Sequence, residues 1–265
     1  MNFKKWFEAN KGTANLFRSL LQDVPQNTDF HPEGDVLAHT RLVRKAIPRA
    51  IQAIQSLQLP VMSNIDFSVS PEEVEILAMA SWLHDIGKHT ATQIQPSGKI
   101  TSYGHQDYDH FMPQIEKFSD IASDSTKEFY LRHKEIIDFL ITHHMDFMSN
   151  NGFPKKFRAA WTDNEGKLKP DPRIKLLLIL MMADKMGRGM KSGESSDDVH
   201  QKAIDFNKNG LEKTYEKSLK QANYAANNNS VAFQGNKEQF INMLKSKGLP
   251  ENIIKKSVEK KFGSY

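Results

Sequence analysis

Several histidines and aspartates in this sequence have the chemistry of ligands for a divalent metal ion. The clearest are the adjacent His84 and Asp85, which follow an apolar run that ends at Leu83. An aspartate is seldom fully buried without a partner, so a His–Asp pair beside an apolar segment needs a compensating positive charge. A divalent ion supplies that charge, and this pair of ligand types suits Mn²⁺, Fe²⁺, Co²⁺, Ni²⁺ or Zn²⁺.

Three more residues of this kind lie on apolar faces of predicted helices. His39, Asp184 and His144 each stand three, four, seven or eight residues from apolar side chains of the same segment, which places them on inward faces. A core histidine or a capping aspartate explains any one of them alone, whereas their combination with His84–Asp85 predicts one metal site. The histidines without such spacing are predicted to be surface or structural residues: His31, His89, His133 and His200.

Helical periodicity dominates the elements that must position these residues, and strand patterns are scarce. Ser70-Pro71 begins one helix with a capping box to Glu73, and Asp171-Pro172 begins another in the same capped way. Pro48 is expected to kink or split its helix. Polar segments with Pro and Gly predict loops over residues 24–35, 89–104 and 149–170. The predicted helices cover residues 3–22, 36–57, 72–86, 105–120, 126–144, 172–187, 198–227 and 236–261.

Composition limits the class of protein. The 265 residues contain no cysteine, which excludes disulfides, zinc fingers and iron–sulfur clusters. No apolar run approaches the roughly 20 residues of a membrane span, and no signal peptide is visible, so we expect a cytoplasmic protein without membrane contact.

Charge divides the chain into two expected parts. Residues 207–265 hold 11 lysines and 5 glutamates, a net charge of +6, whereas the whole chain carries +4. We therefore expect a main domain over residues 1–196 and a lysine-rich helical extension over 197–265, formed in part by two short helices around Gly248-Leu249-Pro250. Such an extension favours a polyanionic partner such as RNA.

The order His39 … His84-Asp85 … Asp184 resembles the HD-domain superfamily of metal-dependent phosphohydrolases. Over roughly residues 28–190 the sequence is most similar to the HD domain of bacterial tRNA nucleotidyltransferases. The similar segments are Phe30–Thr40, with its His-Pro-Glu and Asp followed by His-Thr; Leu83–Lys88, with His-Asp-Ile-Gly-Lys; Gly104-His105-Gln106, with Gln in place of Glu; and Thr142-His143-His144.

The resemblance implies a compact all-α bundle around one or two divalent ions, with Mg²⁺ a further candidate. Asp85 would be both a ligand and the group that orients the attacking water, and Lys88 would neutralise the substrate phosphate. Without the resemblance, Lys88 is a lysine at a helix C-terminus. The implied ligand set is His39, His84, Asp85 and Asp184. His105 and one of His143 or His144, with His110 as an alternative, would hold a second metal or contact the substrate phosphate.

The implied function is hydrolysis of nucleotide or RNA-end phosphates by metal-activated water. The nearest branch indicates 2′,3′-cyclic phosphodiesterase and phosphomonoesterase activity, and hence RNA repair. The nucleotidyltransferase head, a phosphate-binding P-loop and the Gly-Tyr-Pro signature of cyclic-di-GMP hydrolases are all absent from the sequence. Three alternatives remain: a free (deoxy)nucleotide phosphatase or triphosphohydrolase, a non-catalytic module that binds a nucleotide or RNA, and a two-iron oxygenase.

Overall fold

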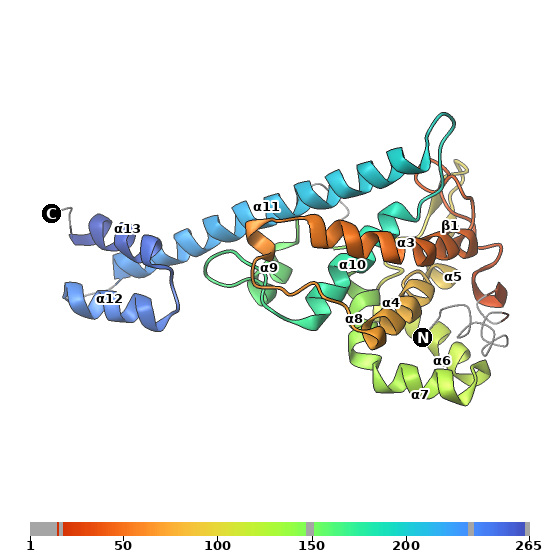
Figure 1. Ribbon diagram of the computed structural model, residues 1–265, viewed down its shortest axis with the longest axis horizontal. Helices are drawn as coiled ribbons and strands as arrows, with labels where there is room; N and C mark the ends of the chain where they lie inside the picture. The colour runs from red at the N-terminus through yellow and green to blue at the C-terminus, as the bar shows by residue number, and fades with distance from the viewer. Residues whose placement is uncertain (1–14, 16–17, 147–150, 233–235, 263–265) are drawn as a thin grey trace. The chain divides into compact units, whose positions relative to one another are not determined.

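The computed structural model describes residues 15, 18–146, 151–232 and 236–262. Within them it contains 11 α-helices and a single short hairpin, which confirms the predicted all-α class (Figure 1). Of the helix predicted over residues 3–22, residues 15 and 18–21 are described and helical, and the remainder lies outside the described residues. None of the described helices is both long and apolar enough to cross a membrane.

The described residues form two compact units. Unit 1 takes its residues from 1–57, 67–146 and 175–207, and unit 2 takes its residues from 58–66, 147–174 and 208–265. The predicted division at residues 196/197 stays a prediction. Two long helices, α10 (Pro172–Met186) and α11 (Ser196–Ala232), supply residues to both units.

Unit 1 is built around α4, against which both α3 and α8 pack. The residues of α4 from Ile76 to Leu83 are buried without a break, as are those of α10 from Leu176 to Asp184. Helices that are apolar on all sides belong in a core. The remaining helices of unit 1 lie around this centre. The bounds are α3 (Val36–Ser56), α4 (Pro71–Leu83), α5 (Lys88–Ala91), α6 (Tyr108–Ile121), α7 (Asp124–Arg132) and α8 (Lys134–His143).

The predicted helix starts follow from local hydrogen bonds. The capping box at α4 is present: the Ser70 hydroxyl accepts from Glu73 N, and the Glu73 carboxylate accepts from Ser70 N. Asp35 caps α3 by accepting from Ala38 N at 2.7 Å. The prediction that Pro48 could split this helix is wrong, because α3 continues for 21 residues with Pro48 inside. Buried residues on both sides of Pro48 hold the helix together.

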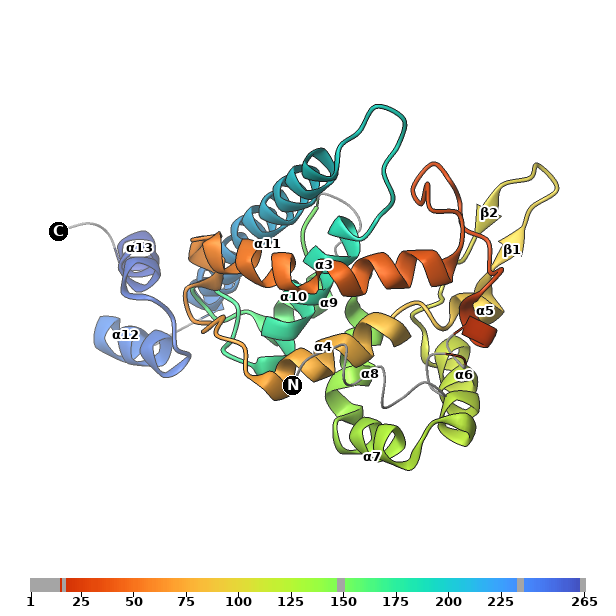
Figure 2. The ribbon, with the colours of Figure 1, turned by 45° about the vertical axis from the view of Figure 1, so that its right-hand side comes forward.

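Four other boundaries differ from the prediction. Residues 89–104 hold an antiparallel hairpin, β1 (Gln93–Ile94) with β2 (Ile100–Thr101), in place of a plain loop (Figure 2). His133 divides the helix predicted over 126–144 into α7 and α8. The 149–170 loop contains α9 (Lys155–Trp161), and α4 ends before the His84–Asp85 turn.

Unit 2 contains α9, residues 208–232 of α11, and the helices α12 (Lys237–Ser246) and α13 (Glu251–Phe262). The end predicted at residue 227 for the helix over 198–227 is wrong, because α11 continues to Ala232. The two short helices expected around Gly248 are confirmed as α12 and α13. They share a small core of Phe240, Leu244, Ile254 and Val258.

Candidate metal centre

Four predicted ligands meet inside unit 1. His39 lies on α3, Asp184 lies on α10, and His84 and Asp85 occupy the turn that follows α4. All four are buried. His39 Nε2 lies 2.9 Å from Asp184 Oδ1 and 3.7 Å from Asp85 Oδ2. His84 Nε2 lies 3.5 Å from Asp85 Oδ2 and 3.8 Å from Asp184 Oδ1.

A second cluster shares Asp85 with the first. His105, from the segment between β2 and α6, places Nε2 at 3.1 Å from Asp85 Oδ1. His144, directly after α8, places Nε2 at 3.6 Å from the same oxygen and 3.2 Å from His105 Nε2. One carboxylate oxygen of Asp85 therefore faces His39 and His84, and the other faces His105 and His144.

Hydrogen bonds fix the protonation of three of these histidines. In His84, His105 and His144, Nδ1 lies 2.9, 2.8 and 2.6 Å from the backbone carbonyl oxygen three residues earlier. A carbonyl oxygen only accepts, so each Nδ1 must donate its proton. In the neutral ring, Nε2 then presents a lone pair toward Asp85.

This arrangement of atoms fits a cation. Lone pairs of histidine Nε2 atoms and carboxylate oxygens converge at this point. Nε2 of His84 is buried without a hydrogen-bond partner among the described residues. Such an atom is costly unless a partner satisfies it. The candidate ligand atoms of His39, His84 and Asp85 lie within 4.8 Å of one another, as do those of Asp85, His105 and His144. His and Asp suit borderline divalent ions.

Burial and charge shift the pKa values of the cluster in opposite directions. Burial lowers the pKa of His84 to about 3, so this ring is neutral and free to ligate. Burial also lowers the pKa of His39, but hydrogen bonds to Asp184 and Glu33 outweigh it and raise the value to about 9. Burial opposes ionisation of Asp85, yet the positive charge of Lys88 and the neighbouring histidines hold its pKa well below the usual range.

Glu33 is a contributor that the residue patterns did not single out. Its Oε1 lies 2.7 Å from His39 Nδ1 and 3.0 Å from His31 Nδ1, while its Oε2 accepts from Gly189 N at 2.7 Å. It therefore orients His39 from behind and ties the chain that enters α3 to the chain that leaves α10. His31 was predicted to be a surface or structural residue, and it supports this carboxylate. Glu33 lies in a loop, so helical periodicity could not predict its role. The similarity of the Phe30–Thr40 segment to the family was the one sequence feature that could have indicated it.

Lys88 is buried at the start of α5. Its Nζ donates to Asp85 Oδ2 at 2.8 Å and to Gln26 Oε1 at 2.7 Å. Because α5 has only four residues, Lys88 begins this helix and also lies in its last turn. Gln26 also donates to the Asp35 carbonyl oxygen, so a loop residue absent from the predicted site orients the lysine.

Two of the predicted histidines lie elsewhere. His143 Nδ1 pairs with Asp146 Oδ2 at 2.8 Å, and His110 Nδ1 lies 3.4 Å from Thr90 Oγ1. Neither belongs to a candidate metal-binding group within the part of the chain that the structure describes. Of His143, His144 and His110, which were the alternatives for a second-metal or phosphate contact, the structure brings His144 to Asp85.

The family model of the HD domain matches residues 36–189, which is more than half of the chain and includes His39, both clusters and Asp184. The chain belongs to the HD domain family. Family members are in general metal-dependent phosphohydrolases that bind divalent ions and act on phosphate substrates. No curated protein and no solved structure matches the chain. The closer similarity of this HD domain to that of tRNA nucleotidyltransferases stays a prediction.

Proposed function

We propose that this HD domain hydrolyses phosphate esters at nucleotide or RNA ends with two divalent ions. The observation that supports this proposal is the shared carboxylate of Asp85, with two histidine Nε2 atoms near each oxygen. Two ions held on either side of this carboxylate would suit phosphoryl chemistry. His39, His84, Asp85 and Asp184 would hold one ion, and Asp85, His105 and His144 would hold the other.

Bound divalent ions would supply Lewis acidity there, which would lower the pKa of a water nucleophile and offset charge on phosphoryl oxygens. The chain's own groups fix the geometry. The carbonyl-bound Nδ1 atoms lock His84, His105 and His144 in one tautomer, so their Nε2 atoms need no reorganisation when ions bind. Burial around them excludes bulk water and strengthens each charge interaction.

Lys88 is the proposed phosphate contact. Its ammonium has three donors, and the described residues supply acceptors for two of them, in Asp85 and Gln26. The third is available to a phosphoryl oxygen of a substrate held at Asp85. A lysine in this place neutralises charge as a compact point charge, which is the usual role of lysine at phosphates.

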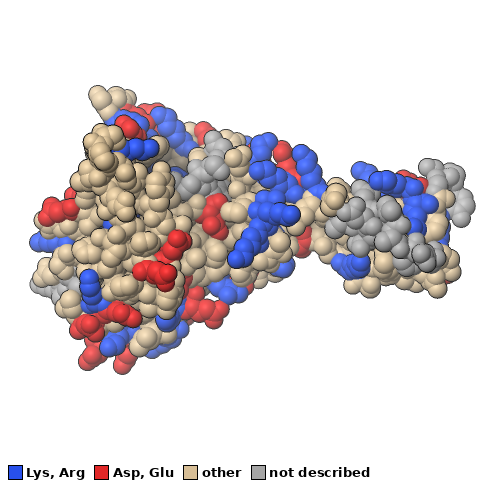
Figure 3. Space-filling model, turned by 180° about the vertical axis from the view of Figure 1, so that it is seen from behind, with Lys and Arg blue, Asp and Glu red and all other residues tan. Residues whose placement is uncertain are grey.

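An RNA end is the preferred substrate in this proposal. The sequence resemblance supports a 2′,3′-cyclic phosphodiesterase and phosphomonoesterase, and the lysines of α12 and α13 support a polymeric substrate. Lys255, Lys256 and Lys260 of α13 are exposed, and Figure 3 shows basic side chains at the surface of this helix pair. Lysines at such a surface bind a nucleic-acid backbone without reading its sequence.

A substrate panel tests the activity. Purified chain is supplied with Mn²⁺, Ni²⁺, Co²⁺ or Mg²⁺ and offered 2′,3′-cyclic nucleotides, 2′-, 3′- and 5′-monophosphates, nucleoside triphosphates and RNA with defined ends. Ring opening or phosphate release from 2′,3′-cyclic or 3′ ends is the expected result. Turnover of free triphosphates or 5′-monophosphates alone would assign the chain to control of nucleotide pools. No turnover with any metal would contradict the hydrolase assignment.

Two histidine variants test the centre itself. We expect His84→Ala to abolish metal binding and hydrolysis together, because it removes a buried Nε2 that has no hydrogen-bond partner among the described residues. His143→Ala is the matched control, since this neighbouring histidine pairs with Asp146 outside both clusters. Metal content is measured by atomic emission after gel filtration. Normal metal content in His84→Ala, or loss of metal in His143→Ala, would contradict the assignment.

A further inference from the structure

The loop that precedes α3 is closed at its base by backbone hydrogen bonds. Val36 N donates to the carbonyl oxygen of Val24 at 3.1 Å, and Gln26 N donates to that of Gly34 at 2.9 Å. These bonds tie the two ends of the loop together. The backbone of Gln26 is therefore fixed beside the start of α3.

The side chain of Gln26 has one orientation that satisfies its neighbours. Its Nε2 lies 3.0 Å from the Asp35 carbonyl oxygen, and its Oε1 lies 2.7 Å from Lys88 Nζ. A carbonyl oxygen only accepts and an ammonium only donates, so a reversed amide would face an acceptor with an acceptor and a donor with a donor. Because Gln26 is only 3 % exposed, bulk water does not replace either contact.

The Asp35 carbonyl oxygen links this amide to a proposed metal ligand. His39 N donates to the same oxygen at 3.1 Å, within the first turn of α3. A carbonyl oxygen has two lone pairs and can accept both bonds. Hydrogen bonds therefore run from Lys88 through Gln26 and Asp35 to the backbone of His39, and this path does not pass through Asp85.

Gln26 holds Lys88 without offsetting its charge. The ammonium pairs with the Asp85 carboxylate at 2.8 Å, and its other acceptor among the described residues is the neutral amide of Gln26. Asp85 belongs to the metal centre, where bound ions would offset its negative charge. A buried charge interacts strongly with its surroundings, so the positive charge of Lys88 is then available to an anion.

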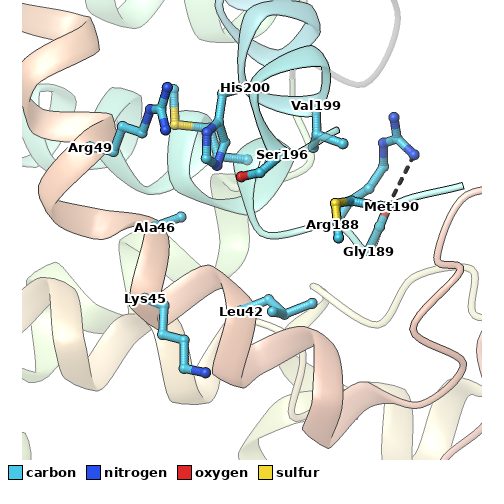
Figure 4. Close-up of a pocket in the computed structure, with 11 residues that line it drawn as sticks. Leu42, Lys45, Ala46, Arg49, Arg188, Gly189, Met190, Ser196, Val199 and His200 are labelled. Carbon is cyan, nitrogen blue, oxygen red and sulfur yellow. Dashed lines mark hydrogen bonds between the residues drawn. The ribbon is translucent and has the colours of Figure 1, made fainter. Parts of the chain in front are cut away.

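Arg188 shows the opposite arrangement. It precedes Gly189, whose N donates to Glu33 behind the ligand set. Its guanidinium donates to both carboxylate oxygens of Glu194, at 3.1 and 2.8 Å. Figure 4 shows Arg188 at another pocket, where it also reaches back to the carbonyl oxygen of Gly189. A carboxylate outside the metal centre thus offsets its charge, which leaves Lys88 as the better group for a substrate phosphate.

We infer that Gln26 is a positioning residue for Lys88. It fixes the ammonium relative to the ligand helix α3 and leaves the positive charge for a phosphoryl oxygen. The inference rests on the proposed function, in which Lys88 is the phosphate contact. Its value to the reaction is that the phosphate contact and the metal ligands keep a fixed separation, because small displacements of a contact group are costly.

Calorimetric titration with inorganic phosphate tests the inference on the full chain loaded with Mn²⁺. Gln26→Met keeps the length of the side chain and removes both amide contacts. The Asp35 carbonyl oxygen keeps its bond from His39 N, so this acceptor is not left unpaired. We expect phosphate affinity to fall by about tenfold, because a misplaced contact group can cost up to about 100-fold. Mn²⁺ affinity and circular dichroism are expected to match the wild type.

The matched control is Gln55→Met. Gln55 also lies on a path to a backbone carbonyl, since its Nε2 donates to the Phe67 carbonyl oxygen at 2.8 Å. It stands on α3 about 24 Å from His39 along the helix axis. Its replacement is expected to leave phosphate affinity unchanged. An equal loss in this control would overturn the inference, because the loss would then not depend on Lys88.

Gln26→Glu tests whether the neutral amide matters. It keeps an oxygen acceptor for Lys88 but places the ammonium between two carboxylates. We expect a larger loss of phosphate affinity than in Gln26→Met, because the second carboxylate offsets the charge and repels the anion. Phosphate affinity equal to that of the wild type would overturn the inference that Gln26 preserves the charge.

A double-mutant cycle with Lys88→Met separates positioning from a structural effect. Lys88→Met alone is expected to weaken phosphate binding, and in that background Gln26→Met is expected to have no further effect. A loss that persists without Lys88, or a matching loss of Mn²⁺ affinity, would overturn the inference. So would full phosphate affinity in Gln26→Met when Lys88→Met is impaired. Full phosphate affinity in Lys88→Met would contradict the phosphate contact of the proposed function, and the inference with it.

Discussion

Glu33 orients His39, a proposed metal ligand. Its carboxylate accepts from His39 Nδ1, so His39 Nε2 is held toward Asp184 and Asp85. Glu33→Gln removes this charge and offers an amide that can donate in its place. Loss of such an outer partner typically costs about 10- to 100-fold in metal affinity. We expect a loss of that size for Mn²⁺, measured by competition with a chromophoric chelator.

Asp146→Asn is the matched control for Glu33→Gln. Asp146 also accepts from a histidine Nδ1, that of His143, at 2.8 Å, but this histidine lies outside both clusters. Its amide variant is expected to bind Mn²⁺ as the wild type does. Equal losses in the two variants would mean that Glu33 acts through general stability and not through His39.

His39 predicts a pH dependence of the metal-free chain. Burial lowers its pKa, but the bonds to Asp184 and Glu33 raise the folded-state value to about 9, above the unfolded value near 6.5. Protonated His39 therefore stabilises the folded state by up to about 3 kcal/mol. This stabilisation is complete below pH 6.5 and is lost as the pH rises through 9. In EDTA, urea unfolding is expected to show a free energy that falls between pH 6.5 and 9.

The other shifted groups act outside this window. The pKa values of Asp85 and Asp184 are lowered, so their stabilisation is lost on acidification. The pKa values of His84 and His105 are also lowered, so these rings affect the free energy of unfolding only below pH 6.5. A His39→Gln chain in EDTA should therefore lack the alkaline decline. A decline that persists in this variant would assign it to another group.

Residue spacing predicted the candidate ligands on helices better than the supporting residues in loops. His39, Asp184 and His144 were singled out because a period of 3.6 residues places each one beside apolar neighbours. The structure brings His39 and His144 to Asp85, and Asp184 to His39 and His84. Glu33 and Gln26 act from loops, where position depends on tertiary hydrogen bonds and not on a local repeat. Their roles could not be derived from spacing.

At the scale of elements, Gly87 determines how closely two segments of the site approach. A Cβ at Gly87 would lie 2.0 Å from the carbonyl oxygen of His105, a contact that requires the backbone to move. Gly87→Ala is expected to destabilise the fold by about 1–3 kcal/mol and to weaken metal binding, because it displaces His105 from Asp85. Urea unfolding and Mn²⁺ titration measure the two effects.

Gly98→Ala separates this clash from ordinary backbone strain. Gly98 lies in the hairpin turn with a φ of +79°, and a Cβ there would have no heavy atom within 4 Å. Its cost is therefore strain alone, about 1 kcal/mol, with no change in metal affinity. If Gly87→Ala behaved like Gly98→Ala in both measurements, the close approach to His105 would not matter.

The elements that the sequence predicted well are those with strong local signals. The capping box at Ser70 and the long apolar run of α10 are both visible in the local sequence. The hairpin β1–β2 was missed because each strand has only two residues, too few for alternation to appear. The division at His133 was missed because α7 and α8 continue one apolar pattern on either side of it.

At the scale of the whole molecule, the two units are discontinuous in sequence. Unit 2 takes its residues from three separate segments, 58–66, 147–174 and 208–265. A change of composition near residue 197 marks where the lysine-rich part begins, but it cannot reveal that earlier loops belong to the same unit. Within unit 2, Asn164 Nδ2 donates to the carbonyl oxygens of Lys247 and Gly248, and Phe153 N donates to Thr214 Oγ1. Removal of residues 207–265 would therefore break contacts of the 147–174 segment, which makes charge reversal a better test of the basic surface than truncation.

The final prediction concerns this basic surface. Lys255→Glu, Lys256→Glu and Lys260→Glu together change exposed positions of α13 and leave the α12–α13 core untouched. Each phosphate contact to single-stranded RNA contributes about 0.7 to the slope of log affinity against log salt. If all three lysines contact RNA, the triple variant should lower that slope by about 2 and weaken binding at low salt.

The matched control reverses three exposed lysines of unit 1: Lys99, Lys117 and Lys127. Fluorescence anisotropy with a single-stranded RNA at several salt concentrations measures both. Equal slopes in the α13 variant and the wild type would exclude RNA contact through this surface. Both variants are expected to hydrolyse mononucleotides as the wild type does, because neither changes a residue of the metal centre.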